Sequence, residues 1–289
     1  MKAMFVTTPT VDCQNHVRAW NSFTRRAEHF VFQAEAIRNC WQIVEKAEAL
    51  QPRVIFYIGP FQGRAVPLPG TFKQLRRIAP VVNLVSDAAD KPWHKTLRYY
   101  ETQGCFDLQV SIDGARDAPV DFATLTPVDP TPFGGQEKNI RCGFSGNVGG
   151  KRASIIDALE WFGGLTVRRE PGSYEDHAAF MSRCQIVLNT SFTGTGQADH
   201  IKGRVLEAAW ANACLLEPAS SPIGDWFPDD CFVTYRDPPD AARLIKALPD
   251  AAVAHTANRL TEEVMTRFTP QKIYTEILAL VGHPEPVAA

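Results

Sequence analysis

The chain has 289 residues, of which 45% are hydrophobic and 21% are charged, and its formal net charge at pH 7 is -2. This composition is typical of a globular protein with one large domain or two domains of ordinary size, and it excludes a disordered chain. Basic and acidic residues are balanced in both halves of the sequence, so we expect no basic surface for nucleic acid.

The seven cysteines form no CxxC pair, and several lie in apolar runs. This pattern predicts reduced, packed thiols. The first residues contain too short an apolar stretch for a signal peptide, and no apolar run approaches the roughly 20 residues of a membrane span. We therefore expect a cytoplasmic protein without a transmembrane segment.

Short apolar runs alternate with helical periodicity along the whole chain, which is typical of βα units around a parallel sheet. In the first half, strands are expected at residues 2–8, 53–59, 81–87 and 106–113. The stretch between the first two strands predicts one long amphipathic helix. Its apolar residues recur near a period of 3.6: Val17, Trp20, Phe23, Phe30, Ile37, Trp41 and Val44.

Residues 114–137 contain four prolines and no clear periodicity, which indicates a linker between two domains. The first domain would span residues 1–137 with this linker, and the second would span 138–289. The α/β pattern restarts after the linker and ends in a helical tail over 239–281. The sequence thus predicts two Rossmann-like domains with parallel sheets that face a central cleft.

In such sheets, ligands bind beyond the carboxyl ends of the strands, so the loops that follow strands are informative. The first such loop of the second half, GNVGGKR, carries Gly146, Asn147, Lys151 and Arg152. Glycines let the backbone approach a ligand, while two cations at a helix start favour a phosphate. The spacing matches neither a Walker loop nor a GxGxxG dinucleotide motif. A plain strand-to-helix turn with two solvated cations is the alternative.

A second loop and the helix after it contain a dense charged cluster: Asp199, Lys202, Arg204 and Glu207. Apolar residues gather on one face of this helix, so Arg204 and Glu207 are expected to project from the other face. Two ordinary roles compete with a binding role. Asp199 would be a helix N-cap, and Glu207 would form an exposed i,i+3 ion pair with Arg204.

Asp199 and Glu207, separated by seven residues, resemble the acid-x7-acid element of retaining glycosyltransferases of the GT-B fold. The stretch from LNTSF through HIKGRVLEAAWANACLLEP is similar to group-1 glycosyltransferase domains related to spore maturation proteins. GFSGNVGGKR resembles the first strand and phosphate loop of the same domain. The resemblance covers residues 138–281 and implies that the last helix packs on the first domain.

The resemblance implies a role for each of these residues. Glu207 would hold the ribose hydroxyls of a nucleotide-sugar, and Asp199 would face the sugar. Backbone N–H groups of the loop at Gly146 and Asn147 would assist at the diphosphate. Its negative charge would be neutralised by cations at the two helix starts: Lys151, Arg152, and Lys202 or Arg204.

The first half offers three candidates, Asp87, Asp90 and His94, at or just after the end of the strand expected at residues 81–87. His94 would contact the donor sugar or act as a base. A structural or merely exposed histidine is the alternative.

The implied activity is transfer of a sugar from a UDP- or GDP-sugar to a glycan, lipid, protein or small-molecule acceptor. No apolar strand leads into an Asp-x-Asp motif, and the histidines show no ligand spacing, so no metal or other cofactor is expected. Two alternatives remain: a nucleotide-sugar epimerase of the same fold, and a non-catalytic nucleotide-sugar-binding module.

Overall fold

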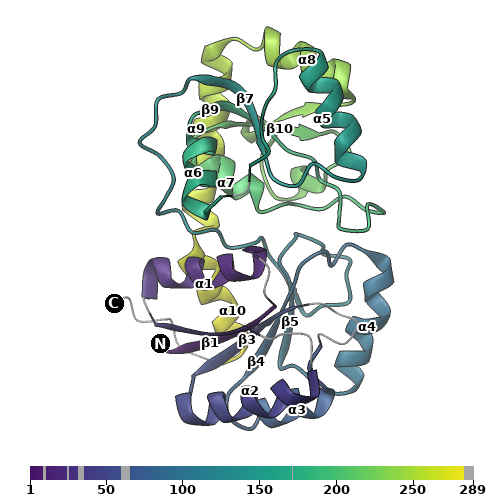
Figure 1. Ribbon diagram of the computed structural model, residues 1–289, viewed down its shortest axis with the longest axis vertical. Helices are drawn as coiled ribbons and strands as arrows, with labels where there is room; N and C mark the ends of the chain where they lie inside the picture. The colour runs from purple at the N-terminus through teal and green to yellow at the C-terminus, as the bar shows by residue number, and fades with distance from the viewer. Residues whose placement is uncertain (9–10, 25, 32–35, 60–65, 171, 283–289) are drawn as a thin grey trace. The chain divides into compact units, whose positions relative to one another are not determined.

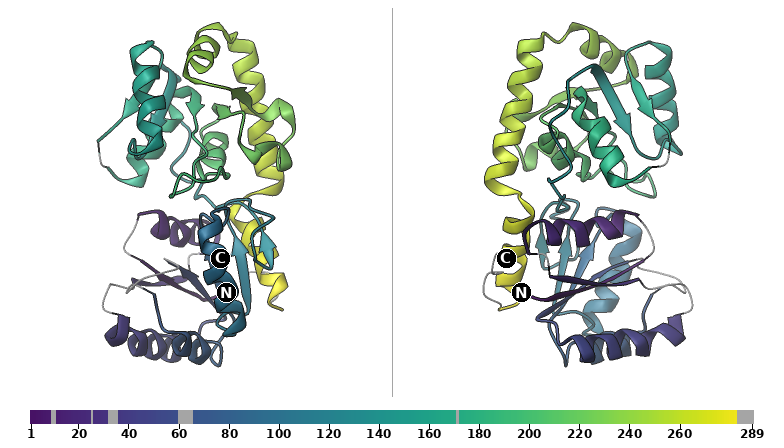
Figure 2. Two further views of the ribbon diagram at one scale, coloured as in Figure 1. Left: turned by 90° about the vertical axis from the view of Figure 1, so that its right-hand side faces the viewer. Right: turned by 60° about the vertical axis from the view of Figure 1, so that its left-hand side comes forward.

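The computed structural model describes residues 1–8, 11–24, 26–31, 36–59, 66–170 and 172–282. The chain divides into two compact units. The first comprises Met1–Asp129 and the chain from Pro270 on, and the second comprises Pro130–Thr269. Each unit is built on one sheet whose described strands are all parallel, with helices on both faces (Figures 1 and 2). The expected α/β fold with two Rossmann-like sheets is confirmed.

The sheet of the first unit has the strand order β2-β1-β3-β4-β5-β6. Its strands are β1 (Ala3–Thr7), β2 (Ala27–Val31), β3 (Val54–Ile58), β4 (Val81–Val85), β5 (Leu108–Ser111) and β6 (Phe122–Ala123). Its helices are α1 (Val11–Thr24), α2 (Ala36–Leu50), α3 (Pro69–Leu75), α4 (Lys91–Thr102) and α10 (Pro270–Leu280).

The first unit has a core on each face of its sheet because side chains alternate along the strands. Phe5 of β1 and Phe56 of β3 stack at 4.9 Å on one face, where Trp20 of α1 and Tyr274 of α10 cover them. The rings of Trp20 and Tyr274 lie 5.0 Å apart. The alternate residues of the same strands pack with buried residues of α2 and α3 on the other face. The last helix is therefore part of the first unit's core.

The sheet of the second unit has the strand order β11-β10-β9-β7-β8. Its strands are β7 (Ile140–Ser145), β8 (Thr166–Arg168), β9 (Cys184–Leu188), β10 (Cys214–Pro218) and β11 (Val233–Tyr235). Its α-helices are α5 (Lys151–Trp161), α6 (Tyr174–Ser182), α7 (Arg204–Trp210), α8 (Pro238–Ala247) and α9 (Asp250–Arg267), with 3-10 turns at Pro222–Asp225 and Asp229–Cys231.

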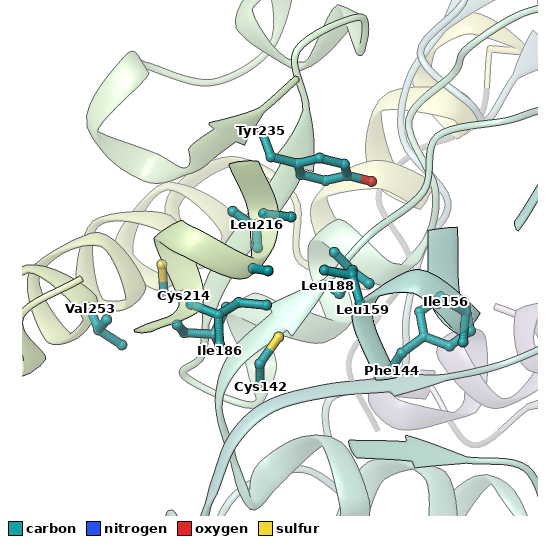
Figure 3. Close-up of a cluster of buried hydrophobic side chains, with 13 residues drawn as sticks. Cys142, Phe144, Ile156, Leu159, Ile186, Leu188, Cys214, Leu216, Tyr235 and Val253 are labelled. Atoms are coloured by element: carbon teal, nitrogen blue, oxygen red, sulfur yellow. The ribbon is translucent and has the colours of Figure 1, made fainter. Parts of the chain in front are cut away.

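A buried apolar cluster fixes the central strands of the second unit against α5 (Figure 3). Phe144 of β7, Leu188 of β9 and Leu216 of β10 pack there with Ile156 and Leu159 of α5. All five side chains are at most 1% exposed. This packing holds the carboxyl ends of β7 and β9 beside the start of α5.

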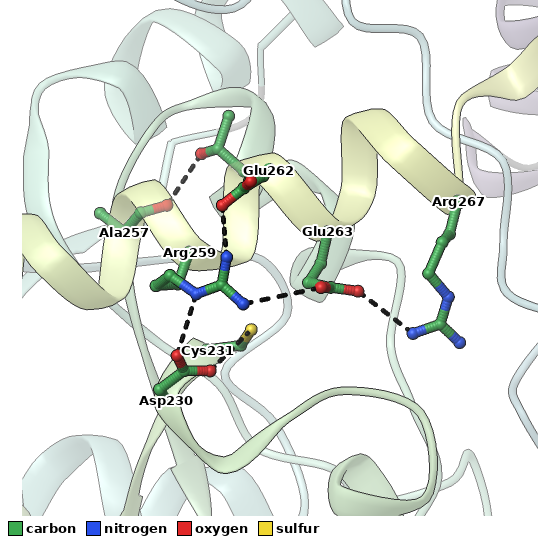
Figure 4. Close-up of polar contacts among 8 residues, drawn as sticks. Asp230, Cys231, Ala257, Arg259, Glu262, Glu263 and Arg267 are labelled. Atoms are coloured by element: carbon green, nitrogen blue, oxygen red, sulfur yellow. Dashed lines mark hydrogen bonds and ion pairs between the residues drawn. The ribbon is translucent and has the colours of Figure 1, made fainter.

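The long helix α9 is tied to a 3-10 turn by a cluster of charged side chains around Arg259 (Figure 4). Arg259 Nε donates to Asp230 at 2.9 Å, and the same guanidinium pairs with Glu262 and Glu263 of α9. Glu263 also pairs with Arg267 at 3.3 Å. The contact of Arg259 with Asp230 connects α9 to the 3-10 turn at Asp229–Cys231.

The structure differs from the sequence-based expectation at two places in the first unit. The long helix expected between the first two strands is two helices, separated by β2. Among the described strands it pairs with β1 alone, and it is half-buried throughout, so its residues lack a clear strand alternation. The side chain of Ile37 and residues 32–35 of the expected helix lie outside the described ones. The expected linker contains β6, which pairs with β5, and the two units divide between Asp129 and Pro130.

Acid should destabilise the first unit through His16 of α1, which is 3% exposed. Burial lowers the pKa of His16 from 6.5 to about 4. The unfolded chain therefore binds a proton at a higher pH than the folded chain does, and stability falls as the pH falls through this window. We expect a loss of about 2 kcal/mol between pH 7 and pH 5 in urea unfolding. His16→Asn should lose less over the same interval, and equal losses would contradict this assignment.

Candidate functional site

The second unit has one topological switch point, between β7 and β9. The chain leaves β7 toward β8 on one side, and β9 continues toward β10 on the other. Ligands of doubly wound sheets bind outside the carboxyl ends of the strands at such a point. Here those ends are Ser145 of β7 and Asn189, which directly follows β9.

Arg204, the first residue of α7, reaches both strand ends at the switch point. Its guanidinium donates to the main-chain oxygen of Ser145 and, at 3.2 Å, to Asn189 Oδ1. It also lies 4.4 Å from the centroid of the Phe144 ring. A Cβ atom on Gly146 would stand 2.6 Å from Arg204 Nη2, and the φ angle of Gly146 is +139°. Only glycine suits this backbone, so the loop's first glycine makes room for the cation.

The glycine loop leads into α5, whose first turn carries no side-chain cap. Asn147 Oδ1 accepts a hydrogen bond from Gly149 N at 2.8 Å inside the loop. Lys151 Nζ donates to the main-chain oxygen of Gly196 at 2.5 Å, and Arg152 donates to that of Phe192 at 3.3 Å. Both cations thus join the α5 start to the loop after β9, which two freely solvated side chains would not do.

The loop after β9 doubles back on itself between Phe192 and Asp199, which form an isolated antiparallel bridge. Asp199 Oδ1 is buried and has no hydrogen-bond partner. The N-cap alternative for Asp199 is wrong, because α7 begins at Arg204 after Gly203. Lys202 lies half-buried just before α7. Asp199 therefore carries an unsatisfied oxygen on the same loop that Lys151 and Arg152 contact.

Glu207 of α7 does not lie on an exposed helix face, and it contacts a histidine of another helix. Its Oε2 lies 3.1 Å from Nε2 of His177 in α6, and the two side chains are 14% and 17% exposed. Burial raises the pKa of Glu207, but His177 and the nearby Arg204 outweigh burial, and the net pKa is lowered. His177 Nδ1 lies 2.8 Å from Ser145 Oγ. The exposed ion-pair alternative is wrong, since α6 covers this side of α7.

A second carboxylate, Glu217, lies fully buried at the end of β10. Asn189 Nδ2 donates to Glu217 Oε2 at 2.8 Å, and Ser191 Oγ donates to the other oxygen. Burial raises the pKa of Glu217 more than these hydrogen bonds and Arg204 lower it. Sequence reasoning missed Glu217, although an acid inside an apolar strand was a usable signal. It also missed Asn189 and His177, and a lone histidine on a helix carried no signal.

Eight of the eleven predicted site residues lie in the second unit. Arg204 contacts both strand ends at the switch point, and Lys151 and Arg152 contact the loop after β9. The other three, Asp87, Asp90 and His94, lie in the first unit after β4. Asp87 has a φ of +56°, and His94 Nε2 lies 3.0 Å from the main-chain oxygen of Ala88.

The described residues contain no group of three or more His, Cys, Asp or Glu side chains placed to hold a metal ion. Among their helices, none combines the length and the apolar character that crossing a membrane requires.

Solved structures share this fold along almost the whole chain. HepE from Anabaena, crystallised with UDP and glucose, has a TM-score of 0.67 and 12% identity over 98% of this chain and 99% of HepE. A glycosyltransferase from Rickettsia africae has a TM-score of 0.63 and 8% identity, over 96% and 98% of the two chains. Sucrose-phosphate synthase from Thermosynechococcus elongatus has a TM-score of 0.63 and 9% identity, over 98% of each. No curated protein matches the sequence significantly.

The stretch that contains the switch point, residues 136–279, matches the family described as glycosyl transferase-like. Residues 136–279 belong to this family. The family and the shared fold indicate a glycosyltransferase with the GT-B fold. The resemblance of the GNVGGKR and HIKGRVLEAAWANACLLEP stretches to such domains is confirmed.

Removing His177 from this glycosyltransferase should destabilise it. His177→Ala leaves the Glu207 carboxylate and the Ser145 hydroxyl without their partner. We expect a loss of about 1–3 kcal/mol in the free energy of unfolding, measured with urea. His255→Ala, at an exposed position of α9, is the control and should change little. Equal stability of the two variants would show that the contact contributes nothing.

Proposed function

We propose that this glycosyltransferase takes its sugar from a nucleoside diphosphate donor, UDP- or GDP-linked, and that the donor nucleotide binds at the switch point of the second unit. The observation that carries the proposal is that three cations lie on the segments that follow β7 and β9. Arg204 lies between the ends of β7 and β9, and Lys151 and Arg152 begin α5 beside the glycine loop. HepE, which shares the fold, was crystallised with UDP and with UDP-glucose.

The diphosphate is assigned to the glycine loop and the start of α5. The uncapped N–H groups of the first helical turn favour an anion, and Lys151 and Arg152 add charge. The backbone at Gly146 and Asn147 lines the same position. Negative charge grows on the departing diphosphate during glycosyl transfer, so fixed cations there stabilise the transition state. Lys202, just before α7, is assigned to the same charge.

The two acids of the second unit are assigned to the sugars. Glu207 is held as a carboxylate by His177 and would accept hydrogen bonds from the ribose hydroxyls. Asp199 has a buried oxygen without a partner, which suits a hydroxyl of the donor sugar. Asp87 and His94 of the first unit are assigned to the donor sugar or to proton transfer.

We further propose that the reaction needs no metal and that the protein is cytoplasmic. The cations of the second unit supply the positive charge that a metal supplies elsewhere. Among the described side chains, six cysteines are free and buried, which fits a reducing compartment. The acceptor is a glycan, a lipid, a protein or a small molecule.

Calorimetry with UDP, uridine, GDP and guanosine tests the donor assignment. The wild type should bind one nucleoside diphosphate more tightly than its nucleoside, and it should hydrolyse the corresponding sugar donor slowly in the presence of EDTA. Lys151→Ala and Arg152→Ala should each weaken diphosphate binding about tenfold and change nucleoside binding little, because only the diphosphate carries the charge that they meet.

Lys246→Ala is the matched control for these variants. Lys246 also donates to a main-chain oxygen, that of Phe162, but at the other end of α5. The Lys246→Ala variant should keep the wild-type affinities for both the diphosphate and the nucleoside. Binding without turnover of any sugar donor would favour a binding module, and equal losses for nucleoside and diphosphate would remove the phosphate assignment.

A further inference from the structure

A chain of hydrogen bonds joins the buried Glu217 to the cation at the switch point. Glu217 accepts from Asn189 Nδ2 at 2.8 Å, and Asn189 Oδ1 accepts from Arg204 at 3.2 Å. Glu217 and Asn189 are both 0% exposed. Ser191 donates to the second oxygen of Glu217, and Tyr235 donates to the main-chain oxygen of Asn189 at 2.9 Å.

The order of donors and acceptors in this chain is set at Glu217. Glu217 Oε2 accepts from Asn189 Nδ2, so Asn189 presents its NH2 group to Glu217. The amide oxygen of Asn189 then has to point the other way, toward Arg204. Arginine only donates, so this oxygen is the partner that the guanidinium requires. With the amide turned around, two donors would face each other inside the protein.

We infer that Glu217 is a positioning residue for Arg204: through the amide of Asn189 it fixes the guanidinium between the ends of β7 and β9, where the donor diphosphate is received. Burying a carboxylate costs free energy, and a purely apolar residue at the end of β10 would avoid that cost. In exchange for this cost, the guanidinium of Arg204 is held in one position before the ligand binds. This inference rests on the proposed function.

The test compares UDP with uridine, and GDP with guanosine, by calorimetry on Glu217→Met and Glu217→Gln. Methionine offers Asn189 no acceptor, so the variant should lose about tenfold in diphosphate affinity, with nucleoside affinity nearly unchanged. Glutamine should keep most of the diphosphate affinity. Its oxygen still accepts from Asn189, and its NH2 group can donate to the hydroxyl of Ser191. A merely structural role would instead lower both affinities together.

Two further variants separate positioning from general damage. Tyr235→Phe removes another buried hydrogen bond to Asn189 but leaves its amide in place, so stability should fall while the diphosphate preference stays. In an Arg204→Gln background, Glu217→Met should cause no additional loss of that preference, because the residue acts through Arg204.

An additive loss in the Arg204→Gln background, or an unchanged preference in Glu217→Met, would overturn the inference. If Glu217→Met does not fold, Asn189→Ala removes the same acceptor while Glu217 keeps Ser191, and it must lose the preference. If the wild type binds neither diphosphate more tightly than its nucleoside, the proposed function fails and this inference fails with it. If the wild type and Glu217→Met bind the diphosphate equally well, and both bind it more tightly than the nucleoside, only this inference is overturned and the proposed function stands.

Discussion

The contact of Arg204 with the ends of β7 and β9 is the interaction on which the second unit's site depends. Two neighbouring parallel strands end there, and one guanidinium donates to the main-chain oxygen of Ser145 at the first and to the side-chain oxygen of Asn189 after the second. The fork of an arginine suits two acceptors at once, whereas a lysine would be a single point charge. A single side chain therefore links the two strand ends at the switch point.

The surrounding residues follow from this contact. Gly146 must lack a side chain because the guanidinium occupies the space where its Cβ would lie. Asn189 must present its oxygen, which requires the acceptor Glu217 behind it. Glu207, on the next turn of α7, is close enough for the charge of Arg204 to lower its pKa, and His177 pairs with it directly. Glu207 and Glu217 thus each have a defined partner, as buried carboxylates require.

Much of the fold could be predicted from the sequence, because buried parallel strands are short apolar runs and their helices repeat near 3.6 residues. The strand β2 was not predicted, because an edge strand with half-buried residues is not a short apolar run. The loops that bear the site could be found from the rule that ligands lie beyond strand ends. The residues that contact Arg204 and Glu207 could not be predicted from the sequence. Helical spacing allows Arg204 to pair with Glu207, but only tertiary packing brings His177 of α6 and Asn189 after β9 to these groups.

A crystal structure of the protein with UDP or GDP, whichever it binds, tests the central claim most directly. The account predicts that the diphosphate lies against the loop at Gly146 and the first turn of α5, within hydrogen-bonding reach of Lys151 or Arg152. A diphosphate bound at any other place in the second unit, or in the first unit, would contradict it.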